Sequence, residues 1–390
     1  MRPLFQENSI SRRIMAVVHL TGELPYRALR FMGTSKTSSM ECARMLVKKG
    51  YLIEEKPFRN GRTLILGKKL METEPFYLAE EVHKKNLQTI YYRNKNKDAY
   101  TRRVRNMYMA ETLALLWEAK IEILPDLKAD LNYETIKQRD VCFYMSKEVK
   151  ELMSKERARA SASRSLGILI VNYQMSLVYH LGMRLPTINL STERTSRDRI
   201  ESILNLHCDY QIKHKKPTLM NSVYMLTYNY HALYMLITGK KKKKSERIQF
   251  VFDDTFLNYY LLPCDRSGIK VLQMMTAVDG IELLRSLVFK PSEQQRKGTG
   301  RIDCDGIKED GTVAFNFMVP DARRLKNFIN GVSIQKRASE PIRACVYCFV
   351  WQEPALREVI DENIKIVAFS TDKVFQLFWE NYKGGIRVQN

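Results

Sequence analysis

Basic and hydroxyl-bearing residues are concentrated in two short segments near the start of the chain. The first segment contributes Lys36, Ser38, Ser39, Arg44 and Lys48, and the second contributes Arg59, Asn60 and Arg62. Hydroxyl and guanidinium groups can hydrogen-bond to base edges, and lysine and arginine pair with phosphate oxygens. These residue types therefore indicate nucleic-acid recognition. We expect Ser38, Ser39 and Arg44 to contact bases, and the other side chains to contact phosphates or the minor groove.

Three helical patterns determine where the first segment lies. Apolar residues at helical spacing predict a first helix over residues 9–20. A second helix is predicted to begin at Leu24 and Pro25, because proline tolerates the first turn of a helix. The polar turn at residues 34–39 is rich in N-cap residues, and a third helix follows it to Lys49. The basic segment thus lies on this third helix.

A hairpin follows the third helix. Two strand-like runs, residues 51–56 and 63–66, enclose an Asn-Gly pair, the strongest short signal for a hairpin. Arg59 and Arg62 flank its tip. The order of these elements resembles a winged helix-turn-helix domain over residues 10–66. That resemblance implies a third helix in the major groove of DNA and a wing on the backbone or minor groove.

The net charge is consistent with the same partner. The 390 residues include 64 lysines and arginines against 43 aspartates and glutamates, a formal net charge of +21. Residues 1–70 alone hold 14 basic and 5 acidic side chains, a net charge of +9. A basic excess favours polyanion partners through its field and through counterion release. A solvated lysine-rich surface is the alternative explanation.

Composition also limits the class of protein. Hydrophobic residues make up 45% of the chain and charged residues 27%, which is ordinary for a folded soluble protein. Seven cysteines, an odd number, suit a reducing cytoplasm better than a disulfide framework. We find no secretory signal and no run of about 20 apolar residues that could span a membrane. We therefore expect a cytoplasmic protein that does not contact membranes.

The whole chain predicts an α+β protein in three parts. We expect residues 1–72 to form the winged helix, residues 73–124 a helical connector or dimerisation helices, and residues 125–390 a mixed α/β domain. The connector is predicted to contain helices over residues 77–92 and 100–117. A homodimer formed through them would suit two-fold DNA half-sites. Toward the end of the chain strands and helices alternate, which is typical of helices packed on a sheet.

The sequence lacks the residue patterns of several known chemistries. It has no His-apolar-His pair of the rolling-circle initiators and no Gly-x-x-x-x-Gly-Lys-Ser/Thr loop for ATP. Cys345 and Cys348 lie three positions apart in a predicted strand, so they point to opposite faces and suit zinc poorly. A metal-dependent nuclease needs clustered carboxylates, but no ordered Asp…Glu-x-Lys pattern links the candidates. These candidates are Asp253, Asp254, Asp303, Asp305 and Glu353. We predict no cofactor, metal or catalytic residue, and a nickase or nuclease in the C-terminal domain is the alternative function.

A second resemblance involves the C-terminal domain. Residues 142–150 and residues 163–167 are similar to segments of mobile-element proteins from Gram-positive bacteria. Together with the N-terminal layout, they make the chain resemble the replication-relaxation family of plasmids and conjugative elements. The resemblance implies a C-terminal domain related to restriction-endonuclease folds, and a role in plasmid or element maintenance.

We therefore expect a sequence-specific double-stranded DNA-binding protein of a mobile genetic element, acting in its replication, conjugation (transfer) or regulation. The other alternative is an adaptor that docks onto replication or transfer proteins, or a regulator that senses a ligand.

Overall fold

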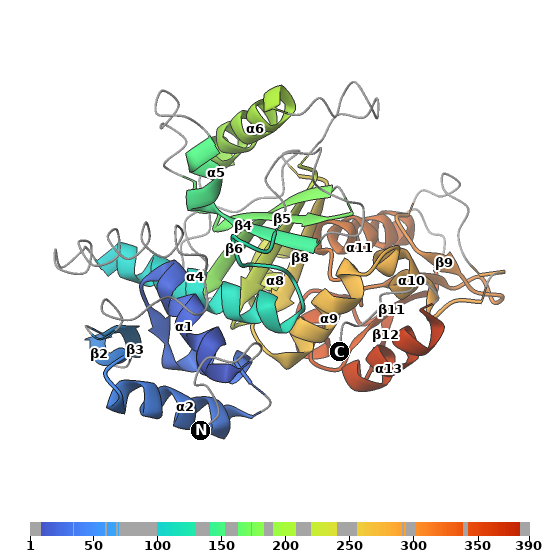
Figure 1. Cartoon of the computed structure of the whole chain (residues 1–390). Helices are drawn as coiled ribbons and strands as arrows, with labels where there is room; N and C mark the ends of the chain where they lie inside the picture. Colours follow the sequence, from blue (N-terminus) through green and yellow to red (C-terminus); the bar gives the residue numbers. More distant parts are fainter. Residues whose placement is uncertain are drawn as a thin grey trace. The chain divides into compact units, whose positions relative to one another are not determined.

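The computed structural model shows an α+β protein, as the sequence predicts, with two compact units, Met1–Ala129 and Asp130–Asn390 (Figure 1). It describes residues 9–33, 35–58, 61–67, 69, 100–128, 141–152, 163–172, 174–182, 190–207, 220–239, 256–290, 292–293, 302–337 and 342–382. The predicted helix over residues 77–92, the carboxylates of Asp253 and Asp254, and the hairpin-tip residues Arg59 and Asn60 lie outside this set.

The first unit contains a three-stranded antiparallel sheet in the order β1-β3-β2. Its elements are α1 (Ile10–Thr21), β1 (Leu24–Pro25), the 3-10 helix η1 (Tyr26–Phe31), α2 (Lys36–Lys48), β2 (Leu52–Phe58), β3 (Gly61–Leu66) and α4 (Tyr100–Glu118). Ser9 caps α1 by accepting a hydrogen bond from Arg12 N, and Gly22 ends it at φ 84°, a left-handed conformation that favours glycine. Ile14 and Val17 of α1 are fully buried, so this helix lies in the core of the unit.

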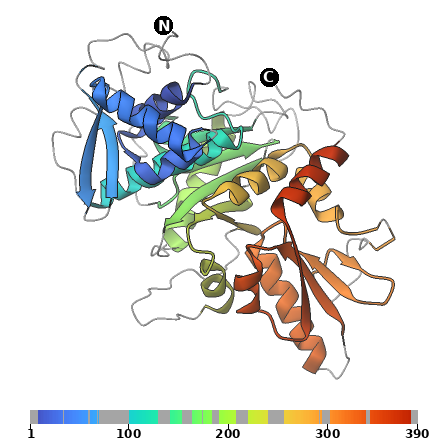
Figure 2. The same cartoon turned by 90° about the horizontal axis from the view of Figure 1, so that it is seen from below.

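β2 and β3 form the hairpin that the Asn-Gly pair predicts. Glu54 lies opposite Leu64, and the register shifts between Glu55 and Phe58. β3 also pairs with β1 on its other side, so β3 is the central strand. Figure 2 shows this hairpin beside α2, against which β2 packs.

The predicted second helix is partly wrong. Leu24 and Pro25 form β1 instead, and the helix that follows is a 3-10 helix. Pro25 has an extended backbone, with φ −70° and ψ 141°, and it lies opposite Thr63 in the sheet. Proline has no N–H to donate, so it suits an edge strand such as β1. The predicted buried side chains are nevertheless confirmed: Leu24, Ala28, Leu29 and Met32 are at most 1% exposed.

The helix α4 belongs to the first unit and packs against α1, η1 and β1. Its buried residues include Met107, Ala110, Leu113 and Ala114. Arg103 of this helix donates hydrogen bonds to Glu23 Oε1 at 2.6 Å and to Glu55 Oε2 at 2.8 Å. Burial raises the pKa of the Glu23 carboxyl, and Arg103 acts in the opposite direction. α4 is therefore attached to the sheet by charge as well as by apolar contacts.

The second unit contains a five-stranded sheet in the order β4-β5-β6-β7-β8. The strands are β4 (Val141–Met145), β5 (Gly167–Val171), β6 (Gln174–Gly182), β7 (Ser222–Thr227) and β8 (Asn258–Pro263). β4, β5 and β6 pair antiparallel, whereas β6, β7 and β8 pair parallel. β7 is buried along its whole length and β8 along nearly all of it, which is typical of parallel strands covered on both faces.

In chain order, five helices of the described part follow the strands of this sheet. They are α5 (Ser146–Leu152), α6 (Leu190–His207), α8 (Ala232–Thr238), α9 (Arg266–Thr276) and α10 (Gly280–Ser286). The apolar run at residues 223–238 predicts one buried helix, but it contains β7 and then α8. A short, fully buried parallel strand shows no alternation of polar and apolar residues, so periodicity does not separate it from a buried helix.

A second sheet of this unit has the order β12-β11-β10-β9. Its elements are β9 (Gly306–Ile307), β10 (Val313–Asn316), α11 (Ala322–Arg337), β11 (Ala344–Phe349), α12 (Glu353–Arg357), β12 (Ile364–Phe369) and α13 (Thr371–Asn381). β10, β11 and β12 are parallel, so the predicted alternation of strands and helices is confirmed. Leu261 N donates to Pro320 O at 2.9 Å, and Tyr260 bridges to Asp321, which joins β8 to the start of α11.

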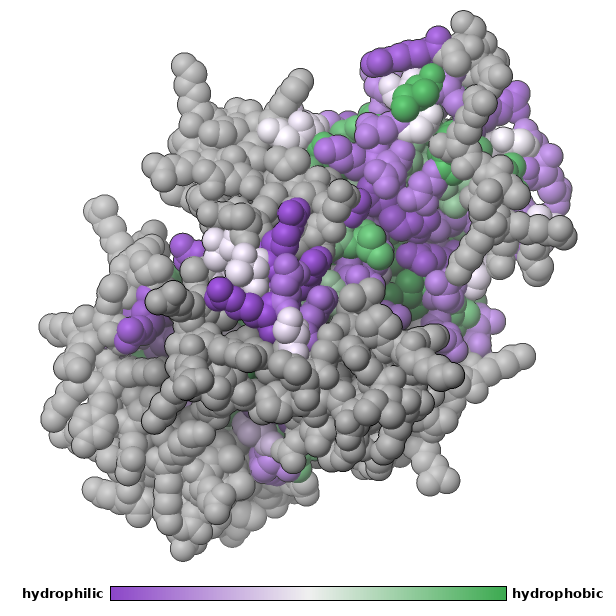
Figure 3. All heavy atoms as spheres, turned by 90° about the horizontal axis from the view of Figure 1, so that it is seen from above, coloured by the Kyte–Doolittle hydropathy of each residue, from purple (hydrophilic) through white to green (hydrophobic). Residues whose placement is uncertain are grey.

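The surface shown in Figure 3 is largely hydrophilic where it is described, and apolar residues appear there in small patches. None of the described helices combines the length and the apolar character needed to cross a membrane.

Candidate nucleic-acid interface

The cap and the spacing of α2 determine which of its side chains face outward. Ser35 caps the helix, because its Oγ accepts a hydrogen bond from Ser38 N at 3.1 Å. Ala43 and Leu46 are fully buried on the inner side. Gly50 follows the end of the helix at φ 77°. The helix therefore has a defined outer face.

The outer face of α2 carries three of the predicted basic residues. Lys36, Arg44 and Lys48 are all exposed. Thr37 and Glu41 are exposed as well, and with Arg44 and Lys48 they are spaced four, three and four residues apart. That spacing keeps side chains on one side of a helix. We call these five residues the α2 face. The sequence prediction missed Thr37, although its helical spacing from Arg44 was a usable signal.

The two predicted serines lie differently. Ser38 is half-buried, and its hydroxyl donates to Ser35 O at 2.9 Å. Ser39 is 0% exposed and its hydroxyl donates to Ser35 O at 3.2 Å. The prediction that Ser39 faces outward is wrong. At 100° per residue Ser39 falls on the same side as Ala43 and Leu46, four and seven positions later.

Two sets of cations in the first unit differ in their ion pairing. The internally paired group comprises Arg13 with Glu118 at 2.9 Å, Arg27 with Glu111, and Arg103 with Glu23 at 2.6 Å and Glu55 at 2.8 Å. Among the residues that the structure describes, no carboxylate pairs with Lys36, Arg44 or Lys48. The positive charge of the α2 face is thus uncompensated by ion pairs and is available to an anion.

Arg62 of β3 belongs to a cluster of three side chains from three elements. Its Nη1 lies 3.5 Å from Glu54 Oε1, and its guanidinium lies 5.0 Å from the centre of the Tyr26 ring. The Tyr26 hydroxyl donates to Glu54 Oε2 at 2.5 Å. The Arg62 side chain remains 53% exposed. The predicted wing arginine is therefore held loosely at the surface, beside a carboxylate.

Tyr26 is a member of the site that the sequence prediction missed. Burial and the neighbouring Glu54 raise the pKa of its hydroxyl to about 12, while Arg62 and Arg44 act in the opposite direction. The hydroxyl therefore stays protonated at neutral pH and acts as the donor to Glu54. The available signal was its position, since it lies outside the apolar periodicity of residues 24–32.

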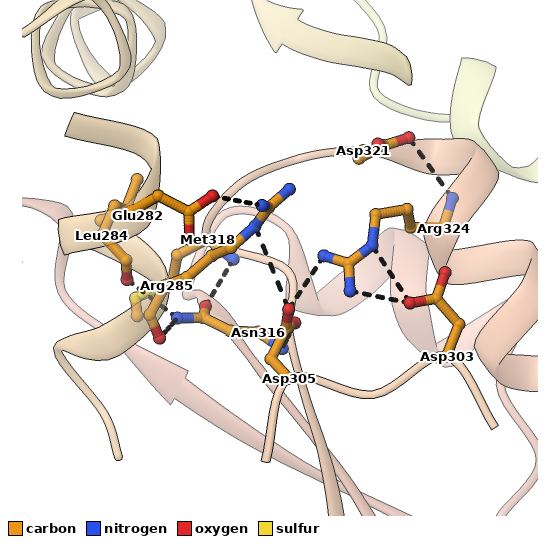
Figure 4. A network of polar contacts seen from close by, with 9 residues as sticks. All are labelled: Glu282, Leu284, Arg285, Asp303, Asp305, Asn316, Met318, Asp321 and Arg324. Carbon is orange, nitrogen blue, oxygen red and sulfur yellow. Dashed lines mark hydrogen bonds and ion pairs between the residues drawn. The ribbon is translucent and has the colours of Figure 1, made fainter. Parts of the chain in front are cut away.

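The nuclease candidates Asp303 and Asp305 are paired with an arginine of α11 (Figure 4). Arg324 donates from Nε and Nη2 to Asp303 Oδ1 at 3.2 and 2.8 Å, and from Nη1 to Asp305 Oδ1 at 2.9 Å. Burial opposes the charge on Arg324, but Asp305 and Asp303 raise the pKa of its guanidinium. Asp305 is 8% exposed, and its Oδ2 accepts a hydrogen bond from Asn316 N at 2.9 Å. These contacts join α11, β10 and the segment before β9.

Asp321 lies next to this network and caps α11. Its Oδ1 accepts hydrogen bonds from the backbone N–H groups of Tyr259 at 3.2 Å, Arg323 at 3.1 Å and Arg324 at 3.3 Å. It is fully buried, and burial raises its pKa. Within the described ranges no three histidine, cysteine, aspartate or glutamate side chains are grouped to hold a metal ion. The carboxylates of this region therefore have evident structural roles.

Glu193 in the first turn of α6 is another buried carboxylate, 1% exposed. Its Oε2 accepts hydrogen bonds from Ser163 Oγ and Tyr179 Oη, and its Oε1 accepts one from Arg164 N, all at 2.7 Å. No cation pairs with Glu193 in the described part of the chain. Three uncharged donors thus hold the first turn of α6 to β6 and to the segment before β5.

Comparison of the chain with models of known protein families, with curated proteins and with solved structures finds no match.

The α2 face and the Tyr26–Glu54–Arg62 cluster together form the candidate interface.

Proposed function

We propose that residues 10–66 form a winged helix-turn-helix that binds double-stranded DNA, with α2 as the recognition helix and the β2–β3 hairpin as the wing. The order of helix, short strand, helical turn, helix and hairpin supports this proposal, as does the sheet order β1-β3-β2. An exposed polar helix can enter the major groove, while a hairpin with an arginine meets the backbone or the minor groove.

The observation that carries the proposal is the difference between the paired and the unpaired cations. Arg13, Arg27 and Arg103 have carboxylate partners inside the unit, where they hold α4 in place. The cations of the α2 face have none among the described residues. Unpaired cations on one exposed helix favour a polyanion, because binding releases its condensed counterions.

Four side chains of the α2 face have a proposed role. Arg44 reads base edges, since a guanidinium can bind guanine O6 and N7 through two hydrogen bonds. Thr37 offers a hydroxyl on the same face of the helix. Lys36 and Lys48 hold phosphates, which position the protein without reading sequence. Ser39 takes no part, because it is buried.

The biological context that we propose is the replication, transfer or regulation of a mobile genetic element in the cytoplasm, by a protein that binds DNA as a homodimer. This context rests on the resemblance of residues 142–150 and 163–167 to segments of mobile-element proteins. The partners would be duplex DNA and the proteins that replicate or transfer the element.

Selection of bound duplexes from a random pool by the full chain tests the function directly. We expect enrichment of one site, and a homodimer would produce two half-sites related by two-fold symmetry, one helical turn or a multiple of it apart. If no duplex of any sequence is retained at low salt, the proposed function is wrong. Enrichment of single half-sites would argue against the homodimer but not against DNA binding.

Arg44→Ala is expected to weaken binding to the selected site by about 1–3 kcal/mol, with a smaller effect on a scrambled duplex. The reason is that a base-reading guanidinium contributes mainly at the correct sequence. Fluorescence anisotropy on both duplexes measures the difference. Arg337→Ala, an exposed change in the second unit, is the control. An equal loss on the two duplexes would show that Arg44 contacts only phosphate.

Arg62→Ala is expected to weaken binding to all duplexes and to reduce the slope of log K against log salt by up to about 1. A wing arginine on the backbone neutralises one phosphate irrespective of sequence. Titrations at four or more salt concentrations measure the slope. A loss confined to the selected site, with the slope unchanged, would assign Arg62 to base reading instead.

A further inference from the structure

Glu54 lies in the candidate interface beside the wing arginine, Arg62, where a phosphate would also have to bind. Its Oε1 lies 3.5 Å from Arg62 Nη1, and its Oε2 accepts the hydrogen bond from the Tyr26 hydroxyl at 2.5 Å. The Glu54 side chain is 32% exposed, so solvent and ligands can reach the pair. Glu54 and Arg62 project from adjacent strands of the same hairpin. The carboxylate is therefore presented on the surface that we propose for DNA.

We infer that Glu54 competes with DNA phosphate for Arg62 and so sets how weakly the protein binds DNA of the wrong sequence. The inference rests on the proposed DNA-binding function and adds a selectivity residue to it. A backbone phosphate can pair with Arg62 only after Glu54 gives up the guanidinium, and the carboxylate then faces the phosphate as a like charge. The base contacts of a correct site must offset this loss.

Tyr26 explains why the carboxylate stays in place. Its hydroxyl fixes Oε2, so Glu54 cannot readily rotate away from the hairpin when DNA approaches. The Tyr26 ring also supports the guanidinium of Arg62 at 5.0 Å. The arginine can consequently leave the carboxylate while keeping its contact with the ring. Its partner can thus change without a rearrangement of the hairpin.

Glu54→Gln separates this role from others, because glutamine keeps an acceptor for Tyr26 and removes only the charge. We expect affinity for a random duplex to rise about 3- to 10-fold at low salt. On the random duplex the slope of log K against log salt should steepen, by at most about 0.9, because Arg62 then meets a phosphate in a larger fraction of the complexes. The ratio of specific to random affinity should fall. Asp126→Asn, an exposed change after α4, is the control, because it removes one negative charge outside the interface.

A double variant tests whether the effect passes through Arg62. In an Arg62→Ala background, Glu54→Gln should raise the affinity much less than it does in the native chain. An undiminished rise there would overturn the inference, because it would show a general effect of net charge. A loss of affinity for the selected site alone would overturn it as well, since Glu54 would then be reading a base.

The two proposals fail in different ways. If the native chain retains no duplex at low salt, the DNA-binding function fails and the role of Glu54 with it. If the native chain binds DNA and Arg62→Ala weakens that binding, but Glu54→Gln changes neither affinity nor slope, only the role of Glu54 fails. Unchanged circular dichroism and melting temperature for each variant show that the comparison is between folded proteins.

Discussion

An Arg324→Met variant is expected to lose about 3 kcal/mol of the free energy of unfolding of the second unit. The change leaves Asp305, which is 8% exposed, and Asp303 without the cation that both contact. A buried carboxylate that loses its partner remains poorly solvated, and this penalty exceeds the strength of the original pair. The same arginine joins α11 to the segment before β9, so the loss should affect the packing of both.

Urea unfolding followed by tryptophan fluorescence measures this loss. Of the three tryptophans, Trp351 and Trp379 lie in the second unit, and a Trp117→Phe background removes the signal of the first unit. Arg337→Met, an exposed change on the same helix, should alter stability by less than about 0.5 kcal/mol. Adding Asp305→Asn to Arg324→Met should restore part of the loss, because it removes a buried charge whose remaining cation is Arg285, with Nε 4.0 Å from Asp305 Oδ1. An unchanged urea midpoint for Arg324→Met would show that the network contributes little.

Glu193→Ala is expected to have a comparable effect, a loss of roughly 3–5 kcal/mol, because it leaves three buried donors without an acceptor. These are the hydroxyls of Ser163 and Tyr179 and the backbone N–H of Arg164. Glu193→Gln should lose less, since its carbonyl oxygen still accepts and the hydroxyls can rotate. Tyr179→Phe should lose least, about 1 kcal/mol, because it removes a single hydrogen bond.

The ranking of these three variants is the informative result. Urea midpoints give the ranking, and hydrogen exchange of the α6 amides shows whether the first turn of that helix has opened. Asp198→Ala is the matched control, since Asp198 lies on the same helix with a 53% exposed side chain that, among the described residues, pairs with Arg197 alone. Equal stability of Glu193→Ala and Asp198→Ala would show that the buried hydrogen bonds do not hold α6.

Local signals in the sequence predicted much of the fold. The Asn-Gly pair placed the hairpin, and the alternation of strands and helices placed the second sheet of the second unit. Both signals act over a few neighbouring residues. The sequence does not predict the strand at Leu24 and Pro25, because the pairing of Pro25 with Thr63 depends on a strand nearly forty positions later. Long-range pairing of this kind leaves no local trace.

The candidate site was predicted only in part for the same reason. The outward cations of α2 follow from helical spacing, and Lys36, Arg44 and Lys48 are exposed as predicted. The hydroxyl of Ser39 is compatible with base contact, but its angle on the helix places it on the buried side with Ala43 and Leu46. The position of Glu54 beside Arg62 depends on the register of β2 and β3. The network of Arg324 joins residues about twenty positions apart, with no spacing that indicates a pair.

The contacts of α4 determine how much of the chain a fusion protein would need in order to carry the proposed DNA-binding unit intact. The boundary suggested by the sequence, at residue 72, falls before this helix. A fragment cut there would keep Glu23 and Glu55 but discard Arg103, the cation that serves both. It would also uncover the apolar side of α1 and η1 on which Leu113 and its neighbours pack. A stable fragment therefore extends at least to Glu118, which forms an ion pair with Arg13 of α1.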